Sequence, residues 1–328
     1  MRAYRLLAIA MVWPVAGFVL AATPQTAPLD TAKQAFEKGD YAKAVDIMKA
    51  AESKDPQNGD VQLLLTKSYL ELNQHDAAVS SGEKAVAINP KSSVYHQWLG
   101  EAYGAKASHA SMFSAYPLAR KTQKEFETAV QLDEKNFDAA QDLVEYDCTA
   151  PGVVGGGEDK AQPIIQKLMT LDPSQGHYAA GNCRQAKKDY AAADAEFTKA
   201  LESKPKSAEL IYNIGDYFRQ RGQADQLAKV ADLGEAAAPG DPRGMYNRAV
   251  SLILKGENLA EADKLLREYL RVAPPKSSYP KAWHVHYWLG QMFEKQKNVA
   301  AARSEYEAAL KLNSKYKTAQ EALKKLGN

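Results

Sequence analysis

Apolar residues along this chain return at intervals of three and four positions, which is the pattern of α-helices with one buried face. These amphipathic segments come in pairs, and each pair recurs after about 34 residues. The same residue types mark the pairs as Ala44, Ala51 and Pro56, as Ala78, Ala85 and Pro90, and as Ala193, Ala200 and Pro205. Proline ends the second helix because it cannot donate the next backbone hydrogen bond. A single hairpin cannot bury its apolar face alone, so the pattern predicts an all-α solenoid of stacked hairpins.

These fixed points resemble the consensus of the tetratricopeptide repeat. The resemblance is carried by Leu99, Gly100 and Tyr103, by Ala193, Phe197, Ala200 and Pro205, by Ile214, Gly215 and Phe218, by Leu289, Gly290 and Phe293, and by the turn at 39–44. It extends over nearly the whole chain after the first 25 residues. The resemblance implies a right-handed α-solenoid whose first helices line a concave, partner-binding face.

We expect about eight repeats in a single solenoid at residues 23–328. Their approximate ranges are 25–58, 59–92, 93–136, 137–173, 174–207, 208–241, 242–275 and 283–316, with a capping helix in 317–328. Glu134 and Ser314 depart from the final proline, and Gly82 and Ala231 are small where a large apolar residue is usual. These departures weaken single repeats without interrupting the array.

Residues 1–22 have the features of a secretory signal peptide rather than of a repeat. Arg2 and Arg5 precede an apolar run at 6–20, and a pair of alanines after the run offers a cleavage site. The run is short for a membrane span, although an uncleaved anchor is the alternative. We therefore expect a periplasmic or secreted protein that is not stably inserted in the membrane after cleavage.

Charge argues against a nucleic-acid partner. The sequence holds 42 Lys and Arg against 40 Asp and Glu, and the signal segment accounts for two Arg and no acid. The mature chain is therefore formally neutral, whereas nucleic-acid binding needs a concentrated basic surface.

The chain lacks recognisable catalytic chemistry. No catalytic triad or nucleophile elbow is visible. Of the six histidines, His96, His177 and His286 occupy one repeat position in three different repeats, so they do not form a cluster with metal-ligand spacing. The sequence therefore predicts a protein that is not an enzyme and that holds no metal and no cofactor.

Two repeats are longer than the others. The third has about ten extra residues within 104–117, where Met112 and Phe113 favour lengthened helices over a loose loop. Either these extra turns pack on neighbouring repeats, or they form a projecting edge that a partner contacts. The fourth repeat carries three glycines at 155–157, and no Gly-Lys-Ser/Thr follows them, which argues against a phosphate loop. We expect a sharp turn with positive φ, followed by a helix that begins with Glu158.

The two cysteines, Cys148 and Cys183, fall on the first helices of repeats four and five. An exported protein with an even cysteine count permits a disulfide between these neighbouring helices. The alternative is a pair of buried thiols that act as small apolar residues.

One repeat position holds tyrosine through the last four repeats, on the helices expected to line the groove. The candidate groove residues are Tyr178, Tyr212, Tyr246, Tyr287, Gln97, Gln141, Glu101, Glu145, Asn182, Asp216 and Arg219. Tyrosine offers apolar area and a hydroxyl group to an extended ligand, although packing of the row against the adjacent helices is an equal alternative. Glu101 and Glu145 favour a basic or amine-bearing segment.

The sequence therefore predicts a non-catalytic interaction scaffold or adaptor of the bacterial cell envelope. Its partner would be a protein or peptide, bound as an extended segment in the concave groove. A periplasmic carrier of a small ligand or glycan is the alternative, because sugars stack on aromatic rings.

Overall fold

The computed structural model describes residues 26–327, which contain seventeen α-helices, one 3-10 turn and no strand. The helices are α1 (Thr26–Glu37), α2 (Tyr41–Glu52), α3 (Gly59–Glu71), α4 (His75–Ile88), α5 (Ser93–Ser108), α6 (Met112–Leu132), α7 (Phe137–Thr149), α8 (Glu158–Leu171), α9 (Pro173–Ala186), α10 (Tyr190–Glu202), α11 (Ala208–Gln220), α12 (Ala224–Ala237), α13 (Pro242–Lys255), α14 (Leu259–Val272), α15 (Ala282–Lys295), α16 (Val299–Leu312) and α17 (Lys317–Leu326). The predicted signal segment lies outside the described residues. Within the described part of the chain, no helix is both long and apolar enough to span a bilayer.

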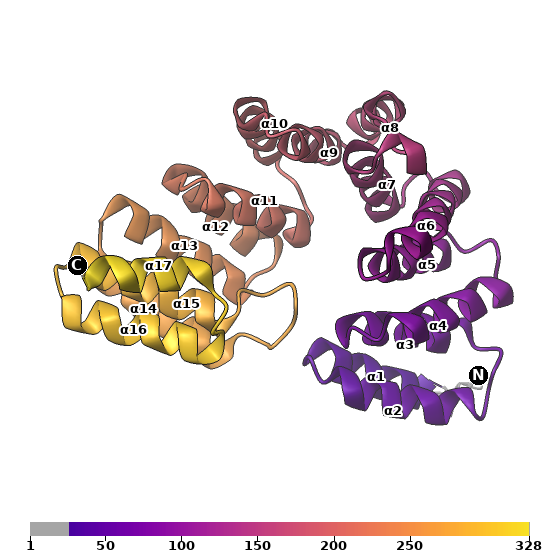
Figure 1. Ribbon diagram of the computed structural model, residues 1–328, viewed down its shortest axis with the longest axis horizontal. Helices are drawn as coiled ribbons and strands as arrows, with labels where there is room; N and C mark the ends of the chain where they lie inside the picture. Colours follow the sequence, from indigo (N-terminus) through magenta and orange to yellow (C-terminus); the bar gives the residue numbers. More distant parts are fainter. Residues whose placement is uncertain (1–25, 328) are drawn as a thin grey trace, which may run out of the picture.

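Consecutive helices pair into eight hairpins, from α1 with α2 to α15 with α16, and the hairpins stack in chain order. In Figure 1 the stack curves into an arc from the indigo N-terminal helices to the yellow C-terminal ones. The last helix, α17, packs on α16, where Ala322, Leu323 and Leu326 cover the buried ring of Tyr306. The predicted α-solenoid with a C-terminal cap is confirmed.

Helix starts follow from short polar side chains at the N-cap positions. Asn136 accepts a hydrogen bond from the backbone N–H of Ala139 at 3.1 Å, and Asp172 accepts one from Ser174 at 2.9 Å. Such caps satisfy backbone donors that have no partner inside the helix. The first helices of the repeats from α3 to α13 carry such caps, so each of them starts at a defined residue, which fixes the face it presents to the groove.

Glycine at one position of the first helix packs against an aromatic ring of the second helix. The pairs are Gly100 with Phe126, Gly181 with Phe197, and Gly290 with Tyr306. A Cβ atom on Gly100 would lie 2.6 Å from the ring of Phe126, which is closer than packed atoms approach. The small residue and the large ring together set the close spacing within each hairpin.

The third repeat has lengthened helices, as the sequence predicts: α5 has 16 residues and α6 has 21. Its tip does not pack on a neighbour, because Met112 is 85% exposed and Phe113 is 93% exposed. Of the two alternatives that the sequence left open, the structure shows the projecting apolar edge at the start of α6.

The glycine-rich turn of repeat four is a structural element. Gly155 has a φ of 108°, and its carbonyl oxygen accepts a hydrogen bond from Gln123 Nε2 at 2.9 Å. The hydroxyl of Tyr146 donates to the carbonyl of Val154 at 2.8 Å. Helix α8 then begins with Glu158, where the helix dipole favours an acid. The turn is thus held by side-chain hydrogen bonds, and it has the expected positive φ.

A disulfide joins Cys148 on α7 to Cys183 on α9, with Cα atoms 5.3 Å apart. The sequence left this pairing open, and the structure contains the bond. It connects the first helices of two successive repeats, the same helices that form the middle of the concave face.

Candidate functional site: an acidic cavity in the concave groove

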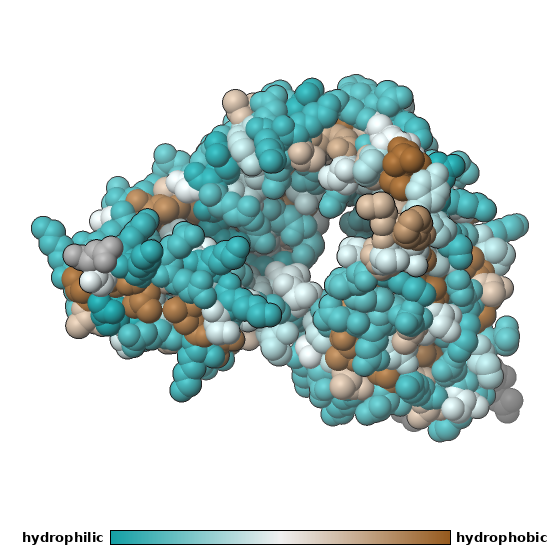
Figure 2. All heavy atoms as spheres, viewed as in Figure 1, coloured by the Kyte–Doolittle hydropathy of each residue, from teal (hydrophilic) through white to brown (hydrophobic). Residues whose placement is uncertain are grey.

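The concave face holds a cavity of about 390 Å³, and its walls come from α5, α7, α9 and the start of α11. All of these are first helices of their repeats, as the family resemblance implies. Figure 2 shows the hollow that the curved stack encloses. The predicted residues that line the cavity are Gln97, Glu101, Gln141, Glu145, Tyr178 and Asn182. The structure therefore brings six of the eleven predicted groove residues into one site.

Five carboxylates line this cavity, four of them on α5 and α7. Asp138, Asp142 and Glu145 follow one another on a single face of α7, and Glu101 faces them from α5. Gln97 Nε2 donates a hydrogen bond to Asp142 Oδ2 at 3.0 Å. Asp138 and Asp142 are not among the predicted groove residues, although their i, i+4, i+7 spacing with Glu145 indicates one acidic helix face.

The surroundings raise the pKa of three of these acids. Burial raises the pKa of Glu101, and repulsion from Glu145 and Asp138 adds to the shift. Burial also raises the pKa of Asp142 well above its ordinary value, with repulsion from Glu101 as the next cause. Glu145 remains in contact with water at the rim, yet the concave wall around it still raises its pKa by desolvation. A cavity of this kind is stabilised by a bound cation, which relieves the repulsion.

Asp142→Asn should stabilise the protein at neutral pH and should lose this advantage near pH 4. Because the pKa of Asp142 is raised, the folded protein keeps its proton at pH values where the unfolded chain, with an ordinary pKa of about 3.9, has lost it. The free energy of unfolding of the wild type therefore falls as pH rises from the unfolded pKa toward the folded one. Asparagine removes this dependence and keeps an oxygen for the Gln97 hydrogen bond. Urea denaturation of both proteins between about pH 4 and pH 8 measures the difference.

Asp225→Asn is the matched control for this experiment. Its hydrogen bond and ion pair with Lys255 lower the pKa of Asp225, so its contribution has the opposite sign. That contribution is present above the unfolded pKa and is lost as pH falls. If Asp142→Asn changed stability by the same amount at every pH, the raised pKa would be disproved.

A lysine of the protein itself already places its ammonium group beside this cavity. The ammonium of Lys67, from α3, lies 4.3 Å from the centre of the Trp98 ring, and Trp98 lines the cavity. Burial lowers the pKa of Lys67, and the charge of Asp138 opposes that shift. An aromatic face beside a carboxylate is a favourable environment for an ammonium group.

Amide groups and a tyrosine also line the cavity. Gln141 Nε2 donates to the backbone carbonyl of Gln175 at 2.8 Å, while Gln141 Oε1 is buried without a hydrogen-bond partner among the described residues. Tyr178 is half-buried; burial raises its pKa, and hydrogen bonds with Asn182 and Asn213 oppose the rise. This wall offers donors and acceptors beside the acidic face.

The tyrosine row does not form a continuous exposed surface. Tyr212 and Tyr246 are buried, with 3% and 0% of their surfaces exposed, whereas Tyr178 and Tyr287 are half-buried. The guanidinium of Arg243 lies 4.4 Å from the Tyr212 ring centre. The expectation of a binding row is therefore wrong for Tyr212 and Tyr246, which pack in the core because the next repeat covers their rings.

The remaining predicted residues lie nearer the C-terminal end. Arg219 Nη1 donates to Asp216 Oδ1 at 2.6 Å, and the guanidinium also faces the Tyr246 ring at 5.4 Å. Tyr287 packs beside the rings of Trp288, Tyr306 and Tyr316. These groups neutralise or cover one another, so the C-terminal half of the groove lacks the unbalanced charge of the middle.

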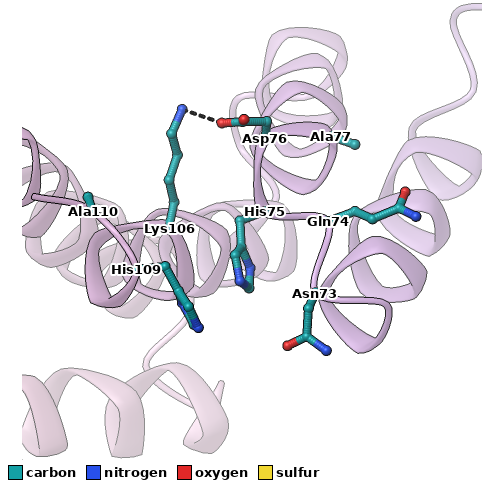
Figure 3. Close-up of a pocket in the computed structure, with 8 residues that line it drawn as sticks. All are labelled: Asn73, Gln74, His75, Asp76, Ala77, Lys106, His109 and Ala110. Atoms are coloured by element: carbon teal, nitrogen blue, oxygen red, sulfur yellow. Dashed lines mark ion pairs between the residues drawn. The ribbon is translucent and has the colours of Figure 1, made fainter.

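A second cavity, of about 510 Å³, lies outside the groove between the start of α4 and the end of α5 (Figure 3). The rings of His75 and His109 stack there with centres 4.4 Å apart, and Lys106 pairs with Asp76 at 2.7 Å. The lengthened α5 is the sequence signal for this meeting, since it carries His109 beyond the usual helix end. Its charged side chains are already paired, so this cavity is a weaker candidate than the acidic one.

The three histidines at one repeat position have structural partners. The ring Nδ1 of each histidine is hydrogen-bonded to the Oε2 atom of a glutamate on the second helix of the same repeat. The pairs are His96 with Glu125 at 2.5 Å, His177 with Glu196 at 2.7 Å, and His286 with Glu305 at 2.7 Å. These contacts link the two helices of a hairpin. Within residues 26–327, no group of three or more His, Cys, Asp or Glu side chains is arranged to hold a metal ion.

Comparison with known proteins agrees with this fold. Three models described as tetratricopeptide repeat match residues 35–103, 174–207 and 249–317. A solved structure of TTC0263, a thermophilic tetratricopeptide repeat protein of Thermus thermophilus, is 20% identical; the match covers 58% of this chain and 97% of that one, with a TM-score of 0.48. A tetratricopeptide repeat protein from Parabacteroides merdae is 13% identical; the match covers 93% of this chain and 99% of that one, with a TM-score of 0.43.

No curated protein matches the chain. The residues matched by the three repeat models fold as stacked helical hairpins, and the protein belongs to the tetratricopeptide repeat family.

Proposed function

We propose that this protein is a non-catalytic interaction scaffold of the bacterial cell envelope that binds a basic, extended polypeptide segment in its concave groove. Tetratricopeptide repeat proteins generally mediate protein–protein interactions. The signal-like N-terminal sequence motivates the envelope location. The observation that carries the binding proposal is the acidic face of α7 opposite Glu101, with raised pKa values that a cationic ligand would reverse.

The geometry suits lysine or arginine side chains more than it suits a glycan. Carboxylates accept charge-assisted hydrogen bonds, and the ring of Trp98 already lies under one ammonium group. The carrier alternative depended on a row of accessible tyrosines, and the burial of Tyr212 and Tyr246 removes the middle of that row. We therefore propose the peptide-binding function alone.

A fluorescent peptide rich in Lys and Arg should bind the protein more tightly than a peptide of equal length rich in Asp and Glu. The double variant Glu101→Gln/Asp142→Asn should weaken binding of the basic peptide by about tenfold or more, because it removes two charges from the cavity wall. Raising the ionic strength should weaken binding as well. Fluorescence anisotropy titration measures each of these effects.

The matched control is Glu257→Gln/Glu307→Gln, which removes the same net charge from two exposed positions outside the cavity. It should leave the affinity for the basic peptide nearly unchanged. Equal binding of the two peptides, or equal losses in the two double variants, would contradict a basic ligand in this cavity.

A further inference from the structure

The segment 273–281 between α14 and α15 is longer than the other links between hairpins and contains Pro274, Pro275 and Pro280. In Figure 1 it extends from the C-terminal half of the arc toward α1 and α3. None of the repeat positions requires this insertion. Its contacts show that it joins two ends of the solenoid.

The base of this segment is firmly attached to its own half of the molecule. The hydroxyl of Tyr279 donates to Asp241 Oδ2 at 3.2 Å, and the guanidinium of Arg243 lies 4.6 Å from the Tyr279 ring centre. Tyr269 donates to the carbonyl of Pro280 at 2.9 Å. Arg243 in turn pairs with Glu209, which lines the acidic cavity, at 2.6 Å. The base is therefore connected through one buried arginine to the groove wall.

The tip of the segment contacts the first two repeats. Lys276 forms an ion pair with Glu37 at the end of α1, 239 residues away in sequence. Ser277 Oγ donates to Glu71 Oε1 at 2.7 Å. Pro275 lies against Gly39, where an added Cβ would be 3.0 Å from Pro275 Cγ. Figure 2 shows the two arms meeting beside the central hollow.

We propose that residues 273–281 form a releasable latch that closes the solenoid into a ring and controls access of a bound segment to the concave face. The tip contacts are few, and apart from the packing of Pro275 on Gly39 they are polar. The Glu37 side chain is 66% exposed, so water and salt can replace the polar contacts. The base contacts include a buried arginine and tyrosine hydroxyls, so opening occurs at the tip. The control of access rests on the proposed function, whereas ring closure does not.

A charge-swap series tests the latch. Spin labels at Lys43→Cys on α2 and Lys264→Cys on α14, both exposed positions, report the distance between the two arms. Glu37→Lys alone and Lys276→Glu alone should each shift the distance distribution to longer values. The combination Glu37→Lys/Lys276→Glu restores opposite charges and should return the short distance. Raising the ionic strength from about 0.05 M to about 0.5 M should open the wild type.

Glu307→Lys is the control for Glu37→Lys, because it makes the same change in charge at an exposed site away from the latch. It should leave the distance distribution unaltered. Single swaps with the wild-type distribution, or a combined variant as open as either single one, would overturn the latch. Circular dichroism melts establish that each variant is folded.

Binding of the Lys- and Arg-rich peptide then tests the control of access. In Glu37→Lys and Lys276→Glu its association rate should rise by on the order of tenfold, because an obligatory opening step no longer precedes binding. An unchanged rate in a variant shown to be open would overturn the control of access. If the peptide bound no variant, the proposed function would fail, and the distance measurements would still decide whether the latch exists.

Discussion

Tyr246→Ala should lower the free energy of unfolding by about 3–5 kcal/mol, the range for truncation of a buried aromatic residue. Tyr246 is fully buried, and its ring centre lies 5.2 Å from that of Tyr269 and 5.4 Å from the Arg219 guanidinium. The truncation leaves a cavity between successive repeats that rigid helices cannot close. Urea denaturation at neutral pH measures the loss.

Two further variants test whether the loss of stability comes from the buried ring of Tyr246. Tyr246→Phe keeps the ring and removes only the hydroxyl, whose neighbour is Trp288, so this change should cost far less. Tyr178→Ala removes a half-buried ring from the acidic cavity and should weaken peptide binding with a smaller loss of stability. If Tyr246→Ala kept its stability and lost peptide affinity, Tyr246 would belong to the binding surface after all.

Reduction of the Cys148–Cys183 disulfide should lower the free energy of unfolding by about 3–4 kcal/mol in the chain-entropy model, because the bond closes a loop with a sequence separation of 35. The oxidised protein should show no reactive thiol when denatured without reductant. Thiol titration and urea denaturation with and without dithiothreitol measure the two effects.

The double variant Cys148→Ala/Cys183→Ala is the control, since its stability should not respond to reductant. Two reactive thiols in the unreduced, denatured wild type would disprove the bond. The disulfide joins α7, which carries the acidic face, to α9, which carries Tyr178. Its reduction should therefore also weaken binding of the basic peptide by loosening the cavity walls.

The sequence alone determined the repeating unit and much of its local structure. Ala193, Ala200 and Pro205 recur at fixed spacing because close helix contacts and helix ends are set by residues near one another in the chain. The positive φ at Gly155 and the helix start at Glu158 were predictable for the same reason. Glu101 and Glu145 were found as groove residues because the repeat position fixes which way a first helix faces.

Only the tertiary structure decided which of those groove residues are accessible. Tyr178 and Tyr246 share one repeat position, yet one lines a cavity and the other is fully buried, because the curvature of the stack and the size of neighbouring side chains differ from repeat to repeat. The exposure of Phe113 and the contact of Lys276 with Glu37 likewise escaped the sequence. Repeat spacing specifies contacts between adjacent hairpins, whereas the meeting of distant ends depends on small rotations that accumulate over the whole solenoid.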